Sequence, residues 1–286
     1  QIFVKFPLSK YIWFDGKLVP VNMAKVPVTT HAIHYGTSIF EGIRAYWNSK
    51  NLHVFRLKDH VKRFRNSGKF YNIKLNFSDR QIENAVIDLC KKNKIKKSCY
   101  IRPFYFVGQY GINFHVTQKA PTHTAIFAFP FGDLFNKSGI TATISKWRKF
   151  SDMSTPTQAK MGGNYLNSIL ATQDAKQRGF DEAILLDQSG NVSEAPGENI
   201  FLVKNNMLVT PSLSSSALDG ITRRSIITLA KDMKLKIKTQ KVSKKELKTA
   251  DEIFLSGTAA EITPVIKIDK KKIGEGKVGN ITKLFM

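Results

Sequence analysis

Lys160 is the residue of this chain whose surroundings most clearly indicate chemistry. It is the only charged residue between Met153 and Gln173, although the chain has 45 lysines and arginines and 23% charged residues. An ammonium group among small, apolar and hydroxyl side chains loses part of its hydration, which lowers its pKa and leaves a nucleophilic amine. Gly162 and Gly163 follow and permit a tight turn and the close approach of a ligand. Without further evidence, Lys160 could equally be an ordinary surface lysine in a polar loop.

A helix is predicted to begin at Asn164, directly after these glycines. Basic residues at 176 and 178 and a glycine at 179 are typical of a helix end. The apolar residues recur at helical spacing, so we expect one face to be apolar. That face would contain Tyr165, Leu166, Ile169, Leu170 and Ala175.

The segment AKMGGNYLNSILATQDAKQRGFDEAILLDQSGNVSEAPGENIFLV (159–203) resembles the signature region of class IV pyridoxal-phosphate aminotransferases, specifically the branched-chain amino acid aminotransferases. The motifs HYGTSIFEGIRAY, YIRP and SGTAAEITP extend this resemblance over nearly the whole chain. It implies a mixed α+β fold of the fold type IV class, similar to D-amino acid aminotransferase. Such enzymes have two domains, with pyridoxal 5'-phosphate bound between them.

The resemblance also implies how the cofactor ring is held. Lys160 would carry the cofactor as a Schiff base and later move a proton. The ring nitrogen must stay protonated, which requires an anionic partner, and Glu194 matches that position. Glu198 is the competing carboxylate, and either glutamate could simply be a loop residue. Tyr165 matches the tyrosine that bonds the phenolic oxygen of the ring, with a core tyrosine as the alternative.

Four residues match positions that hold the cofactor phosphate. Arg63 occupies the arginine position of the family's H-x-x-R pattern, and its planar guanidinium can bind two phosphate oxygens. Ile221 and Thr222 lie at a predicted helix start, where backbone N–H groups attract anions, although a plain helix cap is equally compatible. Thr258 would add its hydroxyl and N–H groups.

The substrate positions follow from the same resemblance. Tyr35, Phe40, Gly42 and Tyr165 match the lining of an apolar side-chain pocket. Tyr100 and Arg102 match a pair that receives the second carboxylate of glutamate or 2-oxoglutarate. Thr258 and Ala259 match the turn that holds the α-carboxylate. Leu134 departs from the pattern, because many bacterial members have a tyrosine there, and this leaves the substrate range open.

We predict two domains, as expected for 286 residues. Residues 1–132 would form a small α+β domain, 133–139 a linker, and 140–286 a larger domain that carries the lysine. In the first domain we expect a hairpin around Asp15-Gly16, two strands within 31–55, and helices over 56–73 and 78–94, the second capped by Ser78. In the second, Ser243 and Glu246 form a capping box.

Composition excludes several other classes of protein. With 42% hydrophobic residues and no apolar run long enough to span a bilayer, the chain reads as soluble and globular, without a membrane partner. Cys90 and Cys99 match no metal or redox spacing and favour a reducing, cytoplasmic setting. His31 and His34 have the spacing of a metal pair but lack a third ligand, so we expect no metal.

The formal net charge of +23 could indicate a nucleic-acid-binding protein, which is an alternative of another class. The lysines are scattered without interleaved aromatics, so solvated lysine faces explain the charge more simply. We therefore expect no nucleic-acid partner. The resemblance implies small-molecule substrates, namely branched-chain amino acids, glutamate and 2-oxo acids, and we expect a homodimer or higher homo-oligomer. Within the same fold, D-amino acid transaminase and aminodeoxychorismate lyase are the alternative activities.

Overall fold

The computed structural model describes residues 9–286 and divides them into two compact units. The first unit takes in the described residues up to Gly132 together with Ala159–Gly163, and the second consists of Asp133–Gln158 and Asn164–Met286. This differs from the division predicted above in two ways. The segment that carries Lys160 belongs with the first unit, and residues 133–139 belong with the second.

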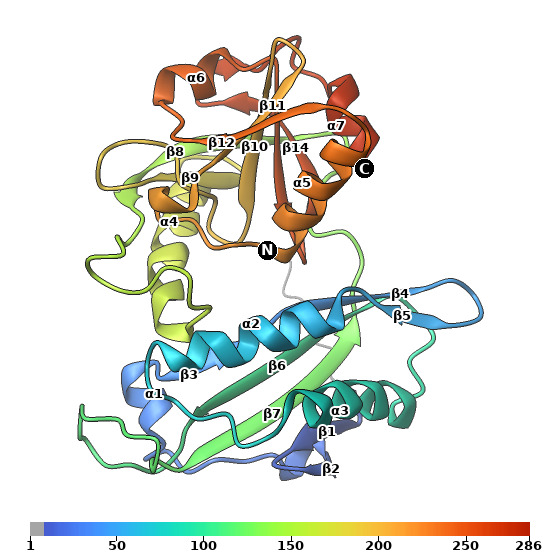
Figure 1. The fold of residues 1–286 in the computed structure, drawn as a ribbon, viewed down its shortest axis with the longest axis vertical. Helices are drawn as coiled ribbons and strands as arrows, with labels where there is room; N and C mark the ends of the chain where they lie inside the picture. Colours follow the sequence, from blue (N-terminus) through green and yellow to red (C-terminus); the bar gives the residue numbers. More distant parts are fainter. Residues whose placement is uncertain (1–8) are drawn as a thin grey trace. The chain divides into compact units, whose positions relative to one another are not determined.

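The first unit contains a seven-stranded antiparallel sheet with two longer helices packed against it (Figure 1). Its strands are β1 (Tyr11–Phe14), β2 (Lys17–Pro20), β3 (Ser38–Phe40), β4 (Ile43–Trp47), β5 (Leu52–Val54), β6 (Cys99–Val107) and β7 (Thr122–Pro130). Its helices are α1 (His31–Tyr35), α2 (Leu57–Lys69) and α3 (Asp79–Lys92), with a short 3-10 turn, η1 (Val21–Met23). The strand order is β2-β1-β7-β6-β4-β5, and β3 also pairs with β6.

The helix α2 is fixed on this sheet by one aromatic contact. The rings of Phe64 and Tyr105 are fully buried and meet edge to face, with centroids 4.7 Å apart. The Tyr105 hydroxyl donates to the Phe64 carbonyl oxygen at 3.2 Å. Burying a side chain of this size contributes about 1.5–3 kcal/mol. This contact anchors α2, which carries His60 and Arg63 before Phe64 and Ser67 after it.

Several predicted elements of this unit are confirmed. The hairpin around Asp15-Gly16 forms, and Ser78 caps α3 in a capping box with Gln81. The two strands predicted within 31–55 form as the β4–β5 hairpin, and α1 and β3, which were not predicted, precede it. Gly36 separates these two elements, because its left-handed φ of 66° ends α1, with its N–H bonded to the Ala32 carbonyl oxygen.

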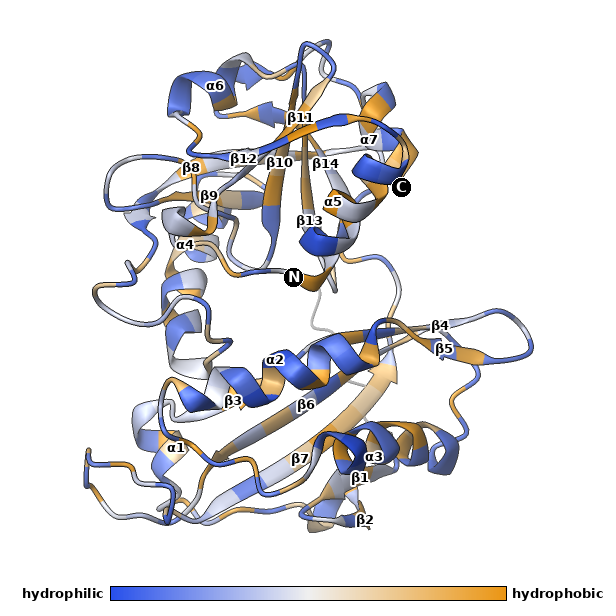
Figure 2. Ribbon diagram, in the orientation of Figure 1, coloured by the Kyte–Doolittle hydropathy of each residue, from blue (hydrophilic) through white to orange (hydrophobic). Residues whose placement is uncertain are grey.

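The second unit is built on an eight-stranded mixed sheet of order β12-β11-β10-β13-β14-β8-β9, with β15 paired to β14. Its strands are β8 (Ile140–Arg148), β9 (Glu182–Leu186), β10 (Asn199–Lys204), β11 (Met207–Pro211), β12 (Lys236–Gln240), β13 (Glu252–Gly257), β14 (Glu261–Ile268) and β15 (Lys271–Lys272). Its helices are α4 (Tyr165–Gln177), α5 (Ile221–Asp232), α6 (Lys244–Thr249) and α7 (Asn280–Phe285), with the 3-10 turn η3 (Leu213–Ser215). The 3-10 turn η2 (Gly162–Asn164) crosses from the segment of the first unit into that of the second. In Figure 2, β10 and β11 are mainly apolar, whereas α6 is mainly polar and is capped by Ser243 and Glu246 as predicted.

The helix predicted after Lys160 forms as α4, and most of its apolar face is exposed. Leu166, Ile169 and Leu170 are 66%, 50% and 40% exposed. The residues that α4 buries are mostly small or polar: Asn167, Ser168, Ala171, Asp174 and Ala175. The reason is that the polar members find backbone partners. Ser168 donates to the Pro196 carbonyl oxygen, and Asn167 donates to the Arg148 carbonyl oxygen at the end of β8.

Candidate active site

The backbone around Lys160 is held tightly by the first unit. The Lys160 N–H donates to Ser67 Oγ at 3.0 Å, and its carbonyl oxygen accepts from the Phe40 N–H at 3.1 Å. Met161 forms a bridge to Ile39 of β3. These contacts with α2 and β3 place Lys160 in the first unit although it lies far along the chain.

The two glycines after Lys160 let the chain lie against itself. The Gly163 N–H donates to the Gly36 carbonyl oxygen at 3.2 Å, and a Cβ on Gly36 would lie 2.9 Å from the Gly163 Cα. A Cβ on Gly162 would collide with the Ser38 hydroxyl. The packing of this turn on β3 and the residues before it therefore requires glycine at positions 36 and 162.

The Lys160 amine is the strongly perturbed group that the sequence predicted. Its Nζ lies 4.8 Å from the centroid of the Phe40 ring. Burial, and then the guanidinium of Arg63, lower the pKa of Lys160 from 10.5 to about 8, although Glu41 opposes them. Roughly a tenth of an amine with this pKa is neutral at pH 7. The first unit therefore holds a nucleophilic amine at neutral pH.

Glu41 is the main functional residue that sequence reasoning missed. Its carboxylate is fully buried and lies 2.6 Å from Arg63 Nε, 2.8 Å from Arg63 Nη2 and 2.7 Å from His60 Nδ1. Burial opposes its ionisation, but Arg63 and then His60 outweigh this effect, so the pKa of Glu41 lies well below its usual value of 4.5. An acidic residue in the otherwise apolar run Ser38–Ile43 was the available signal.

The Glu41 pair also limits what Arg63 can do. Its Nε and Nη2 atoms both donate to Glu41, so one bidentate edge of the guanidinium is already occupied. A phosphate would therefore have to meet the Nη1 side. Burial lowers the pKa of His60 more than Glu41 raises it, so the neutral ring donates its Nδ1–H to the carboxylate.

Four of the predicted substrate residues lie together in the first unit. The Arg102 guanidinium lies 4.6 Å from the Phe40 ring centroid, and its Nη2 donates to the Tyr100 hydroxyl at 3.0 Å. Arg102 Nε is buried without a hydrogen-bond partner among the described residues. A Cβ on Gly42 would collide with the Tyr100 hydroxyl, so glycine is needed there. An arginine held this way suits an external carboxylate.

Glu194, which matches the ring-nitrogen position, is 5% exposed in the second unit. Its Oε1 lies 2.6 Å from Lys149 Nζ, and its Oε2 accepts from the Leu218 N–H at 2.9 Å and from Asn199 Nδ2 at 3.3 Å. The competing carboxylate, Glu198, accepts from the N–H of its neighbour Gly197 at 3.1 Å. Glu194 is thus built into a charged, buried network.

The other predicted residues lie at helix ends and in one turn between strands. Tyr35 ends α1 with 37% exposure, and Tyr165 begins α4. Ile221 and Thr222 form the first turn of α5 after the cap residue Gly220, where an anion is favoured. Thr258 and Ala259 lie in the turn between β13 and β14. Leu134, in the second unit, lies with Phe135 and Thr172 around a hollow of about 500 Å³.

The histidine pair considered as a metal site has other partners. His31 is buried, with Nδ1 2.8 Å from Thr37 Oγ1 and Nε2 3.1 Å from the Asn113 carbonyl oxygen. Among residues 9–286, no cluster of three or more His, Cys, Asp or Glu side chains could hold a metal. In the same range, no helix has the length and apolar character needed to cross a membrane.

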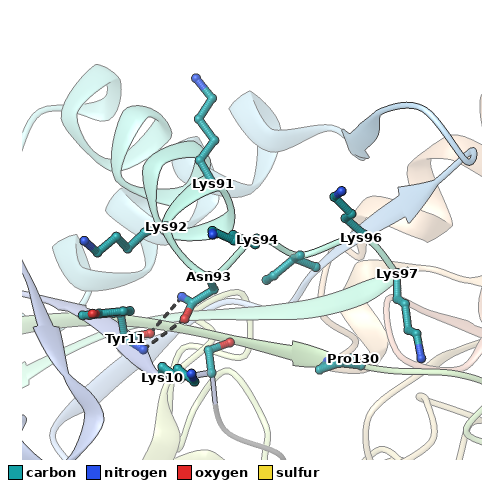
Figure 3. A pocket seen from close by; sticks show the side chains of 11 residues that line it. Lys10, Tyr11, Lys91, Lys92, Asn93, Lys94, Lys96, Lys97 and Pro130 are labelled. Atoms are coloured by element: carbon teal, nitrogen blue, oxygen red, sulfur yellow. Dashed lines mark hydrogen bonds between the residues drawn. The ribbon is translucent and has the colours of Figure 1, made fainter.

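Part of the positive charge surrounds a surface hollow of about 920 Å³ in the first unit (Figure 3). Asn93 closes one side by bonding both the N–H and the carbonyl oxygen of Tyr11, at 3.0 Å each. The lysines on its rim do not converge, since Lys91 and Lys97 point in opposite directions. Their arrangement is that of solvated side chains and gives no centre at which one anion would be gripped.

The chain is similar to known proteins over nearly its whole length. The family model for amino-transferase class IV matches residues 38–268. The branched-chain-amino-acid aminotransferase of Salmonella typhimurium is 45% identical over 279 residues, covering 96% of this chain and 90% of that protein. The crystal structure of the Escherichia coli branched-chain amino acid aminotransferase has 44% identity and a TM-score of 0.94, covering 97% of this chain and 92% of that one.

A third similar protein was crystallised with its cofactor. It is the branched-chain amino acid aminotransferase from Thermobaculum terrenum in its PLP-form (holo-form), with 33% identity and a TM-score of 0.92 over 97% of this chain and 92% of that one. The chain therefore belongs to the class IV aminotransferases, a family of mixed α+β fold. Its similar proteins named here are all branched-chain amino acid aminotransferases.

The Glu41 network generates a prediction about stability. Glu41→Gln leaves Arg63 and His60 without a buried carboxylate, so we expect a loss of about 3–5 kcal/mol at pH 7. The folded pKa of Glu41 lies below its unfolded value, so its stabilisation is complete above about pH 4.5 and is lost as the pH falls toward the folded pKa. Urea unfolding at pH 7 and pH 3.5 should show the gap between wild type and variant shrinking at low pH.

Glu83→Gln on α3 is the matched control and should change stability by less than about 0.5 kcal/mol at either pH. A Glu41→Gln protein as stable as this control would contradict the role given to the ion pair.

Proposed function

We propose that this chain is a branched-chain amino acid aminotransferase that exchanges the amino group between leucine, isoleucine or valine and 2-oxoglutarate, with pyridoxal 5'-phosphate as cofactor. The observation that carries the proposal is the buried Lys160 amine with a pKa of about 8, in a chain similar over nearly its whole length to proteins of that name. D-amino acid transaminase and aminodeoxychorismate lyase remain the alternatives within the fold.

The residues present suit this cofactor. When bound, pyridoxal phosphate supplies an aldehyde that accepts the amino group and a ring that takes up electrons from the substrate. The neutral Lys160 amine is the group that would hold the aldehyde carbon and then move a proton from the substrate Cα. Burial excludes water from this amine, which keeps its proton available for the substrate.

The remaining cofactor contacts are proposals from the matched positions. Glu194 would bond the protonated ring nitrogen, and the buried ion pair it forms keeps it anionic for that purpose. Tyr165 would donate to the phenolic oxygen. The phosphate would be held by Arg63, through its Nη1 side, and by the groups at the α5 start and the β13–β14 turn: Ile221, Thr222 and Thr258.

The substrate contacts divide into apolar and charged groups. Phe40, Gly42, Tyr35 and Tyr165 would receive the aliphatic side chain, and Thr258 and Ala259 the α-carboxylate. Arg102 would pair with the second carboxylate of glutamate, and its unsatisfied Nε supports this role. The same guanidinium stacks on the Phe40 ring. When an apolar substrate side chain lies beside Arg102, the guanidinium therefore still has the ring as a partner.

We also propose that the enzyme works as a homodimer or higher homo-oligomer. The exposed side chains of Leu166, Ile169 and Leu170 on α4 support this, because contiguous apolar surface marks association sites. A sedimentation mass equal to one chain at micromolar concentration would contradict it.

A cytoplasmic location is proposed on similar grounds. Cys90 and Cys99 are both buried free thiols, which is typical of proteins in a reducing compartment. Recovery of the protein from an oxidising compartment after cell fractionation would contradict this location.

The direct test of the activity is a half-reaction screen on the purified holoenzyme. L-leucine, L-isoleucine and L-valine should each abolish the visible band of the bound cofactor, and 2-oxoglutarate should restore it. D-alanine should leave the band unchanged, and aminodeoxychorismate should yield no pyruvate. A response to D-alanine alone, or pyruvate release, would assign the chain to one of the two alternatives.

The role of Arg102 can be separated from the rest of the site. In Arg102→Leu, the half-reaction with glutamate should lose a charge-assisted contact worth about 1.5–3 kcal/mol, which is roughly ten- to a hundredfold in the specificity constant. Leucine offers no second carboxylate, so its half-reaction should change much less. Stopped-flow measurement with each amino acid decides the point, because equal losses would make Arg102 structural.

A further inference from the structure

Lys149 is a buried lysine that none of the cofactor or substrate assignments above uses. It follows β8 directly, and its N–H donates to the Leu186 carbonyl oxygen at 2.9 Å. Its own carbonyl oxygen accepts from Gln188 Nε2 at 2.8 Å. With both backbone groups bonded and its side chain only 13% exposed, its Nζ is directed to Glu194 Oε1 at 2.6 Å. This is a fixed ammonium beside one carboxylate.

We propose that Lys149 is a positioning residue for the cofactor ring: its ammonium keeps the buried Glu194 carboxylate ionised and orients it, and it sets the charge that the ring environment presents. The inference rests on the proposed function in one respect, the pairing of Glu194 with the ring nitrogen. Lys149 acts through Glu194 and has no contact of its own with the reacting atoms.

The charged groups around Glu194 favour Lys149 for this role. The other contacts of Glu194 are neutral donors, the Leu218 N–H and Asn199 Nδ2. A buried carboxylate without a cation takes up a proton rather than staying charged. Arg223 of α5 is the second cation whose charge reaches Glu194, but its Nη1 is bound to Asp219 at 3.4 Å.

Tyr165 of α4 is the other titratable group that acts electrostatically on Lys149. Burial disfavours the Lys149 ammonium, but Glu194 and then Tyr165 outweigh burial and raise its pKa, so the lysine stays charged. Lys149 is thus coupled to two residues assigned to the cofactor ring, one for its nitrogen and one for its phenolic oxygen. Removal of the Lys149 charge should therefore affect both Glu194 and Tyr165.

The first test uses cofactor-free protein and measures urea unfolding between pH 8 and pH 5. In Lys149→Gln the amide can still donate to Glu194, but the positive charge is gone. Glu194 should then take up a proton on folding, so the variant should gain stability relative to wild type as the pH falls. Lys149→Arg keeps the charge and should follow wild type.

The second test uses the holoenzyme and titrates the visible absorption of the bound cofactor with pH. A Glu194 that has taken up a proton no longer keeps the ring nitrogen protonated, and loss of that positive charge makes it easier to protonate the cofactor–lysine link. The midpoint should therefore rise by about one pH unit in Lys149→Gln. Lys149→Arg should restore the wild-type midpoint. Lys146→Gln, which removes a lysine that is 67% exposed on β8, should move neither readout.

Three results would overturn the proposal. Lys149→Gln could behave like Lys146→Gln in both tests, or Lys149→Arg could behave like Lys149→Gln, which would make shape rather than charge decisive. If Lys149→Gln does not fold, the double variant with Glu194→Gln places two neutral amides together and should fold. An unfolded double variant would show that Lys149 serves packing.

These readouts do not depend on which amino acid the enzyme accepts. A donor screen that favours D-alanine would refute the proposed function while leaving both Lys149 tests interpretable. Conversely, an unchanged titration midpoint in an enzyme active on leucine would refute only the role of Lys149.

Discussion

The loss of hydration at the Lys160 ammonium is the constraint on which the rest of the candidate site depends. An exposed lysine is almost fully protonated at neutral pH and is a poor nucleophile. The residues before and after Ala159–Gly163 belong to the second unit, but this segment packs against α2 and β3 of the first unit. The packing that fixes the backbone is also what buries the amine, so the fold and the reactivity have the same cause.

A buried charge must be paired with an opposite charge, and the chain has two such buried ion pairs near the candidate site residues. In the first unit, Glu41 is paired with Arg63, and in the second unit Glu194 is paired with Lys149. Each carboxylate is nearly inaccessible to water, and each ion pair would cost several kcal/mol to break on one side. Arg63 lowers the Lys160 pKa while Glu41 raises it, so the first pair also adjusts the reactive amine. We interpret both ion pairs as fixing charged side chains in the positions from which they would bind a charged cofactor.

The sequence predicted the reactive lysine and many of the helices and strands. Local signals were sufficient where the determinant is local: the capping boxes at Ser78 and Ser243, and the Asp15-Gly16 turn, depend on residues within a few positions of each other. Glu41 and Lys149 were missed because their partners lie far away in the sequence. Which face of α4 is buried could not be predicted, because polar side chains such as Ser168 have backbone partners that only the tertiary structure supplies. The unit to which Lys160 belongs is likewise set by long-range contacts.

The identity of the nucleophile is tested most directly by reduction of the holoenzyme with borohydride, followed by peptide mapping. The cofactor should be found covalently bound to Lys160, at close to one equivalent per chain, and Lys160→Arg should yield no reduced adduct. Lys149, which is also buried, is the informative comparison within the same digest and should remain unmodified. An adduct on any other lysine, or none at all in a protein that retains its cofactor, would contradict the assignment of Lys160.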